Sequence, residues 1–170
     1  EAFSATDAQA FYERYYVPAN MVIAVAGDVD PTAVFSLAER YFGDIPAGPT
    51  VARPETWIAK RTGTVRVSVE ERVPAAQVLK VWNTPEWGSR DSHLLELAAA
   101  LLARGQGSRL HVRLVRKDGI ATAVSASQED LEIAGQFHVS ATASRGVDLA
   151  KVERALDEEL ARLLADGPTA

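Results

Sequence analysis

Two neighbouring segments in which polarity alternates constrain the fold more than any other feature of this chain. Residues 120–127 read IATAVSAS, and residues 135–144 read GQFHVSATAS. Alternation with a period of two is typical of β-strands that bury one face and leave the other open. Because a short connection joins the two segments, we expect them to pair as an antiparallel hairpin.

Three segments upstream are also predicted to be strands. Valine alternates with polar residues over 65–69, and AAQVLKVWNTP at 75–85 is expected to pair with this segment as a second hairpin. The run NMVIAVAG at 20–27 is apolar almost throughout and rich in β-branched residues. That composition is typical of a strand that is buried on both faces.

Capping residues and helical periodicity predict five helices around these strands. Ser4 with Asp7 resembles a capping box, and Asp30 with Pro31 is a second start signal. The predicted helices are 7–16, 31–42, 89–105, 108–117 and 148–166. Candidate core residues at helical spacing are Leu94, Leu97, Leu101 and Leu102 in the third helix, and Leu149, Val152, Leu156, Leu160, Leu163 and Leu164 in the last.

Strand pairs with helices between them predict an α+β fold, in which a mostly antiparallel sheet has helices packed on one face. A chain of 170 residues has the length of one domain, so we expect residues 1–170 to form a single domain. Residues 44–62 contain three prolines and predict a long surface connection. Because the sequence begins at Glu1 in mid-pattern without methionine, we expect a segment of a longer protein.

Composition excludes several classes of function. A net charge of −5 argues against a nucleic-acid surface over much of the molecule. The absence of cysteine excludes disulfides and thiolate metal sites. No apolar run approaches the roughly 20 residues of a membrane-spanning helix, so we expect no membrane span in this segment.

The stretch GSRLHVRLVRKDGIATAVSAS at 107–127 carries the densest positive charge. It lacks the glycines and the Gly-Lys-Ser/Thr ending of a phosphate loop. Arg109, Arg113 and Arg116 share one face of the predicted helix, which we interpret as a solvated face. An anion or nucleic-acid site on these arginines is the alternative, and salt-dependent binding would be its mark. Gly119 is expected to turn the chain with a positive φ.

Histidine placement gives no metal site. HLLEL at 93–97 has the start of His-x-x-Glu-His, but Leu97 stands where the second histidine would be, and leucine cannot bind zinc. His111 and His138 lie on other predicted elements, so we interpret His93 and these two as surface or edge residues. We therefore assign no catalytic and no metal-binding residue to this segment, and the substrate-binding residues stay open.

Four stretches together resemble the carboxy-terminal domain of a half-molecule in the M16 (pitrilysin/insulinase) family of zinc metallopeptidases. They are FYERYYVPANMVIAVAGDVDP at 11–31, ERYFGDIP at 39–46, PAAQVLKVWNTPEWGSRD at 74–91 and the stretch 107–127. The resemblance covers nearly all of the chain and keeps the family's order.

This resemblance implies a non-catalytic structural domain of a bacterial peptidase whose halves close around a peptide. The zinc motif His-x-x-Glu-His would lie in an upstream domain, so this segment would hold no cofactor while the parent protein binds zinc. Its partners would be the peptide, through the parent, and other M16-type domains in the same or a partner chain. The compartment stays open and includes the bacterial periplasm or cell envelope.

One departure from the family pattern bears on which half this is. Many partner halves carry an arginine and a tyrosine seven residues apart that hold the substrate, and the matching positions here are Val115 and Thr122. Neither can act as such a donor pair, which favours the zinc-bearing half. The alternative is a binding or assembly module of an inactive M16-like subunit.

Overall fold

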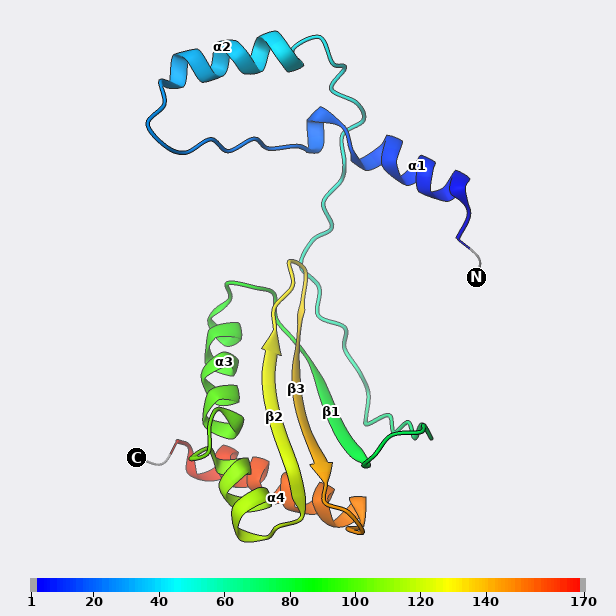
Figure 1. Cartoon of the computed structure of the whole chain (residues 1–170), viewed down its shortest axis with the longest axis vertical. Coiled ribbons are helices and arrows are strands. Elements are labelled where there is room, and N and C mark those ends of the chain that lie inside the picture. Colours follow the sequence, from blue (N-terminus) through cyan, green and yellow to red (C-terminus); the bar gives the residue numbers. More distant parts are fainter. Residues whose placement is uncertain (1–2, 169–170) are drawn as a thin grey trace. The chain divides into compact units, whose positions relative to one another are not determined.

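The computed structural model describes residues 3–168, and the chain divides into two compact units at Pro54 (Figure 1). The amino-terminal unit contains the helices α1 (Ala5–Tyr15) and α2 (Pro31–Phe42), with the short 3₁₀ turn η1 (Pro18–Asn20) between them. The carboxy-terminal unit contains β1 (Gln77–Thr84), α3 (Arg90–Ala103), the π-helical η2 (His111–Lys117), β2 (Ala121–Glu129), β3 (Gly135–Ala143) and α4 (Leu149–Asp166).

Local capping explains where the first two helices begin. The Ser4 hydroxyl accepts a hydrogen bond from the Asp7 amide at 3.2 Å, and the Ser4 amide donates to the Asp7 carboxylate at 3.0 Å. Asp30 caps α2 by accepting from the amide of Thr32 at 3.0 Å. Each contact satisfies a donor that the first helical turn leaves unpaired, and both predicted starts are confirmed.

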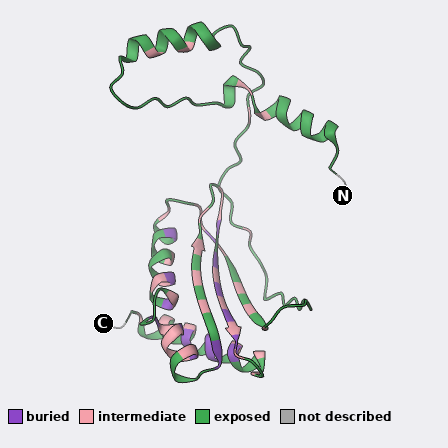
Figure 2. Ribbon diagram, viewed as in Figure 1, coloured by how far each residue is buried: buried purple, intermediate pink, exposed green. Residues whose placement is uncertain are grey.

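A three-stranded antiparallel sheet in the order β1-β3-β2 forms the centre of the carboxy-terminal unit. Burial of the side chains alternates strictly along the central strand β3, and its core-facing side chains are buried under the helices. Figure 2 shows the buried residues gathered on β3, η2, α3 and α4. The buried apolar core consists of Ala99, Leu102, Leu110, Leu114, Ile120, Ala121, Phe137, Val139, Ala141, Ala143, Val152, Ala155 and Leu156. The α+β fold is therefore confirmed.

Two predicted strands are absent from the described structure. Residues 21–26 and 65–69 are extended but pair with no other strand, and Val67 is 76% exposed. The hairpin expected between 65–69 and β1 was thus a wrong prediction. A strand is defined by its partner rather than by its own side chains, so a correct polarity pattern does not form one where no neighbour pairs with it.

The buried faces of two helices also differ from the predicted stripes. In α3 the leucines Leu94, Leu97 and Leu101 are exposed, and the helix buries Ser92, Ala99 and Leu102 instead. Small side chains face β2 there, which lets the helix backbone approach the sheet. Near the end of α4, Leu164 is 87% exposed, whereas its neighbour Leu163 packs against the core, so Leu164 lies on the outer side of the helix. The other core positions predicted on α4 are buried or pack against the core.

Gly119 ends η2 with φ of 63°, as expected. We predict that Gly119→Val lowers the free energy of unfolding by roughly 2 kcal/mol, because a β-branched residue resists the left-handed region. No atom would lie within 4 Å of an added Cβ, so the cost is backbone strain and not a clash. Urea unfolding measures it, with Gly107→Val as the matched control, since Gly107 has open space and no positive φ. Equal midpoints for the two variants would contradict the prediction.

Within residues 3–168 no helix is long and apolar enough to cross a membrane.

Candidate functional site

The arginines of the stretch 107–127 lie against α4. Arg109 donates from Nε to Glu159 at 2.8 Å and from Nη1 to the carbonyl of Gly167 at 3.2 Å. Arg113 donates to Asp118 at 2.7 Å and to Glu158 at 2.9 Å. Both guanidinium groups are half-buried, so interpreting them as a solvated face was wrong for these two.

The same ion pairs argue against an anion-binding site on these arginines. Two of its three cations are already neutralised by carboxylates at hydrogen-bond distance. Only Arg116 of the three is exposed. The contacts of Arg109 and Arg113 with Glu159 and Glu158 fasten this corner to α4.

The three histidines lie on three different elements. His93 is exposed on α3, His111 is half-buried on η2, and His138 on β3 has its Nε2 atom 3.4 Å from the Glu129 carboxylate. Within the described residues 3–168, no group of three or more histidine, aspartate or glutamate side chains could hold a metal ion. With no cysteine in the sequence, the donor set of this chain does not fit a tight zinc site.

Val115 and Thr122 lie on either side of the turn at Gly119 and carry uncharged side chains. Val115 packs partly buried against the core, on η2. Thr122 lies where the register of β2 and β3 shifts, and its hydroxyl donates to the carbonyl of Thr142 at 3.4 Å. Neither side chain presents a charged donor at this corner.

The sheet's uncovered face is polar on β2 and β3, whereas on β1 it carries the exposed Leu79 and Val81. Register places Ser125, Ser127, His138 and Ser140 on it, opposite the buried face of β3. The hydroxyls of Ser125 and Ser140 lie 2.8 Å apart across the two strands.

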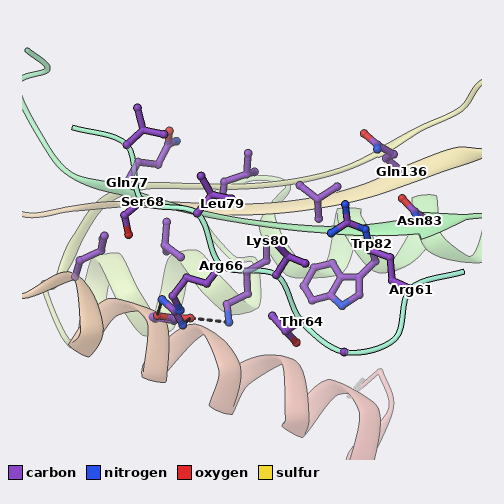
Figure 3. A pocket seen from close by; sticks show the side chains of 18 of the residues that line it. Arg61, Thr64, Arg66, Ser68, Gln77, Leu79, Lys80, Trp82, Asn83 and Gln136 are labelled. Atoms are coloured by element: carbon purple, nitrogen blue, oxygen red, sulfur yellow. Dashed lines mark hydrogen bonds and ion pairs between the residues drawn. The ribbon is translucent and has the colours of Figure 1, made fainter. Parts of the chain in front are cut away.

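A groove of about 720 Å³ runs between the extended segment 61–69 and β1. Figure 3 shows Arg66 and Lys80 pointing to α4, while Trp82 and Arg61 lie farther along the groove. No motif in the sequence pointed to this groove. The sequence held one signal for it. Lys80 is a cation at a strand position where the alternation predicts a core-facing side chain.

One carboxylate on α4 forms ion pairs with side chains from both sides of the groove. Glu153 accepts two hydrogen bonds from Arg66, at 3.0 and 2.7 Å, and one from Lys80 at 3.1 Å. These hydrogen bonds, from Arg66 first and then Lys80, lower the pKa of Glu153 from 4.5 to about 2. Burial lowers the pKa of Lys80, but its bonds to Asp157 and Glu153 outweigh burial and raise that pKa overall.

This arrangement is a set of internal ion pairs. The lining carboxylate is held as an anion by two cations, so it is unsuited to act as a general base near neutral pH. Arg66 belongs to the extended segment, and Glu153 and Lys80 belong to α4 and β1. The ion pairs therefore hold the segment 61–69 beside the sheet although no strand ladder does.

We predict that the protein loses stability at acid pH because the Glu153 carboxylate becomes protonated. The folded pKa is depressed, so the stabilisation is complete above about pH 4.5 and is lost as the pH falls toward 2. Because solvent screens the exposed Arg66, the loss should be roughly 1–2 kcal/mol. Urea unfolding between pH 7 and pH 3 should show a smaller pH dependence for Glu153→Gln. Glu158→Gln, on the same helix and more exposed, should keep the wild-type slope; identical slopes for all three proteins would contradict the assignment.

Comparison with known proteins gives one family across the chain. The family model described as the peptidase M16 inactive domain matches residues 2–170. An uncharacterized zinc protease of Mycobacterium leprae is 28% identical over 170 residues, covering 99% of this chain and 38% of its own length. The zinc protease PqqE of Helicobacter pylori is 27% identical, covering 93% of this chain and 35% of its own.

Solved structures share the fold. A protease from Helicobacter pylori matches 98% of this chain and 41% of its own with a TM-score of 0.80 at 22% identity. A peptidase M16 inactive domain from Pseudomonas fluorescens matches 98% of this chain with a TM-score of 0.68 at 21% identity. The chain spans well under half the length of the curated relatives that it matches.

Proposed function

Because the chain belongs to the peptidase M16 family and matches its inactive domain, we propose that it is a non-catalytic structural domain of a zinc-dependent peptidase. The observation that carries the proposal is a combination: the family match spans 2–170, while the donor set of the described residues does not fit zinc. The relatives that match this chain are named zinc proteases, and each of them is longer than this chain. We take residues 1–170 as one functional domain, because the family match extends through both compact units.

The proposed role is to pack against an upstream zinc domain and to wall the chamber in which peptides are enclosed and hydrolysed. Zinc held in that upstream domain would supply an activated water for peptide hydrolysis. This chain contributes surface. The polar face with Ser125, Ser127 and Ser140 suits a chamber wall, because its hydroxyls can bind peptide groups without a fixed sequence preference.

Peptide turnover tests this role. The isolated chain is expected to hydrolyse no peptide, whereas the parent protein should do so and should carry His-x-x-Glu-His in the domain before Glu1. Turnover by the isolated chain would overturn the proposal. Absence of both the motif and turnover from the parent would favour the alternative, an assembly module of an inactive subunit.

The assignment to the zinc-bearing half has its own test. Val115→Ala and Thr122→Ala in the parent should leave turnover within a few-fold, because neither side chain carries a donor that stabilises the transition state. Loss of such a donor costs about 10²–10³ in kcat. A loss of that size from Thr122→Ala, with the fold intact by circular dichroism, would mean that the chain belongs to the other half.

A further inference from the structure

The amino-terminal unit has no core of its own. None of the described residues 3–54 is buried, and neither α1 nor α2 contains a buried side chain. Figure 2 shows these helices almost entirely exposed, in contrast to the carboxy-terminal unit. A segment of this length that buries no apolar side chain cannot offset its conformational entropy, so it needs a partner to be stable.

Both helices present a wide apolar face to that partner. On α1, the rings of Phe11 and Tyr15 lie 4.6 Å apart between centroids and tilted by 42°, one turn apart on the same side. On α2, Val34, Ala38 and Tyr41 follow helical spacing, and Ser36 lies on the opposite, polar side. Each helix is therefore built to cover an apolar surface on one side only.

The segment between the helices has the properties of an unpaired inner strand. From Val22 to Ala26 it is extended and makes no backbone hydrogen bond within the described residues, and Val22 is 92% exposed. Five consecutive apolar residues suit a strand that is covered on both faces. Its free amides and carbonyls require a neighbouring strand on at least one edge.

We infer that residues 3–54 are a docking element, and that residues 21–26 enter the β-sheet of a domain lying in the parent polypeptide outside residues 1–170. This inference rests on the proposed function and names the surface through which the packing occurs. A sheet supplies the hydrogen bonds that the strand lacks, and α1 and α2 then cover the faces of the extended sheet. One interface thus satisfies the strand and both apolar helix faces.

The length of the relatives supports this occupant. The fold match to the Helicobacter pylori protease extends through 98% of this chain, yet more than half of that protease lies outside the match. A second copy of the chain fits less well. Two copies of residues 21–26 would form a two-stranded ribbon, which is marginal by itself and leaves apolar faces uncovered.

Hydrogen exchange of the amides from Val22 to Ala26 tests the inference. They should exchange almost without protection in the 170-residue chain and at least about 100-fold more slowly in the parent protein, because closed strand hydrogen bonds open only rarely. Fast exchange in both proteins would overturn it. Protection in the isolated chain would also overturn it, in favour of the carboxy-terminal unit if the chain is monomeric and of a second copy if it is dimeric.

Two matched variants separate docking from folding. Ile23→Lys in the parent should abolish the protection at 22–26, whereas Ser36→Lys introduces the same charge on the polar side of α2 and should keep it. In the isolated chain, both variants should leave the urea midpoint of residues 55–170 unchanged. An inactive parent with protected amides would defeat the proposed function alone; an active parent with unprotected amides would defeat the docking inference alone.

Discussion

Replacing Arg109 with methionine is expected to lower the free energy of unfolding of the carboxy-terminal unit by roughly 2–4 kcal/mol. The cause is the carboxylate of Glu159, whose side chain is only 8% exposed. Arg109 meets it at 2.8 Å, and the other cation near it, Arg162, lies at 3.4 Å. Removing the arginine leaves a buried charge without its main partner, and such charges are costly. Urea denaturation of the 170-residue chain measures the loss.

Arg116→Met is the control, because Arg116 belongs to the same basic stretch but is exposed. Its effect should stay below about 0.5 kcal/mol, the usual range for surface substitutions. The double variant Arg109→Met with Glu159→Leu should recover most of the lost stability, since both charges are then gone. A single-variant effect as small as that of Arg116→Met would show that the ion pair does not hold η2 to α4.

Leu156→Ala is expected to cost roughly 3–4 kcal/mol, because the leucine is fully buried and alanine would leave a cavity. Leu156 lies in the core cluster with Leu110, Leu114 and Val139, so its loss removes contacts between α4, η2 and the sheet. Leu164→Ala makes the same change two turns later on α4, at an exposed position, and should cost less than about 0.5 kcal/mol. Equal costs at the two sites, measured by urea unfolding, would place the core elsewhere on α4.

Local signals in the sequence predicted much of the fold. The capping side chains of Ser4 and Asp30 act within three residues, and the alternation in β2 and β3 acts within a hairpin, so both could be read from the sequence. The segments 21–26 and 65–69 have the correct polarity for strands but lack partners in the described structure. Whether a segment pairs depends on a neighbour that its own residues do not specify.

The site was harder to predict because its contacts are distant in sequence. Arg109 and Glu159 are fifty residues apart, and Arg66 and Glu153 are farther apart still. The sequence showed a row of arginines, but their partners on α4 depend on how that helix crosses the sheet. Resemblance to a family supplied what local physics could not, namely the family to which the chain belongs.

The most direct test of the account is the zinc content of the isolated 170-residue chain after dialysis against a weak chelator. Tight zinc sites need three or four well-placed ligands, and this chain has three histidines on separate elements and no cysteine. We predict no stoichiometric zinc in the isolated chain, and zinc in the parent protein. One zinc per isolated chain, lost when His93 is replaced by alanine, would contradict it.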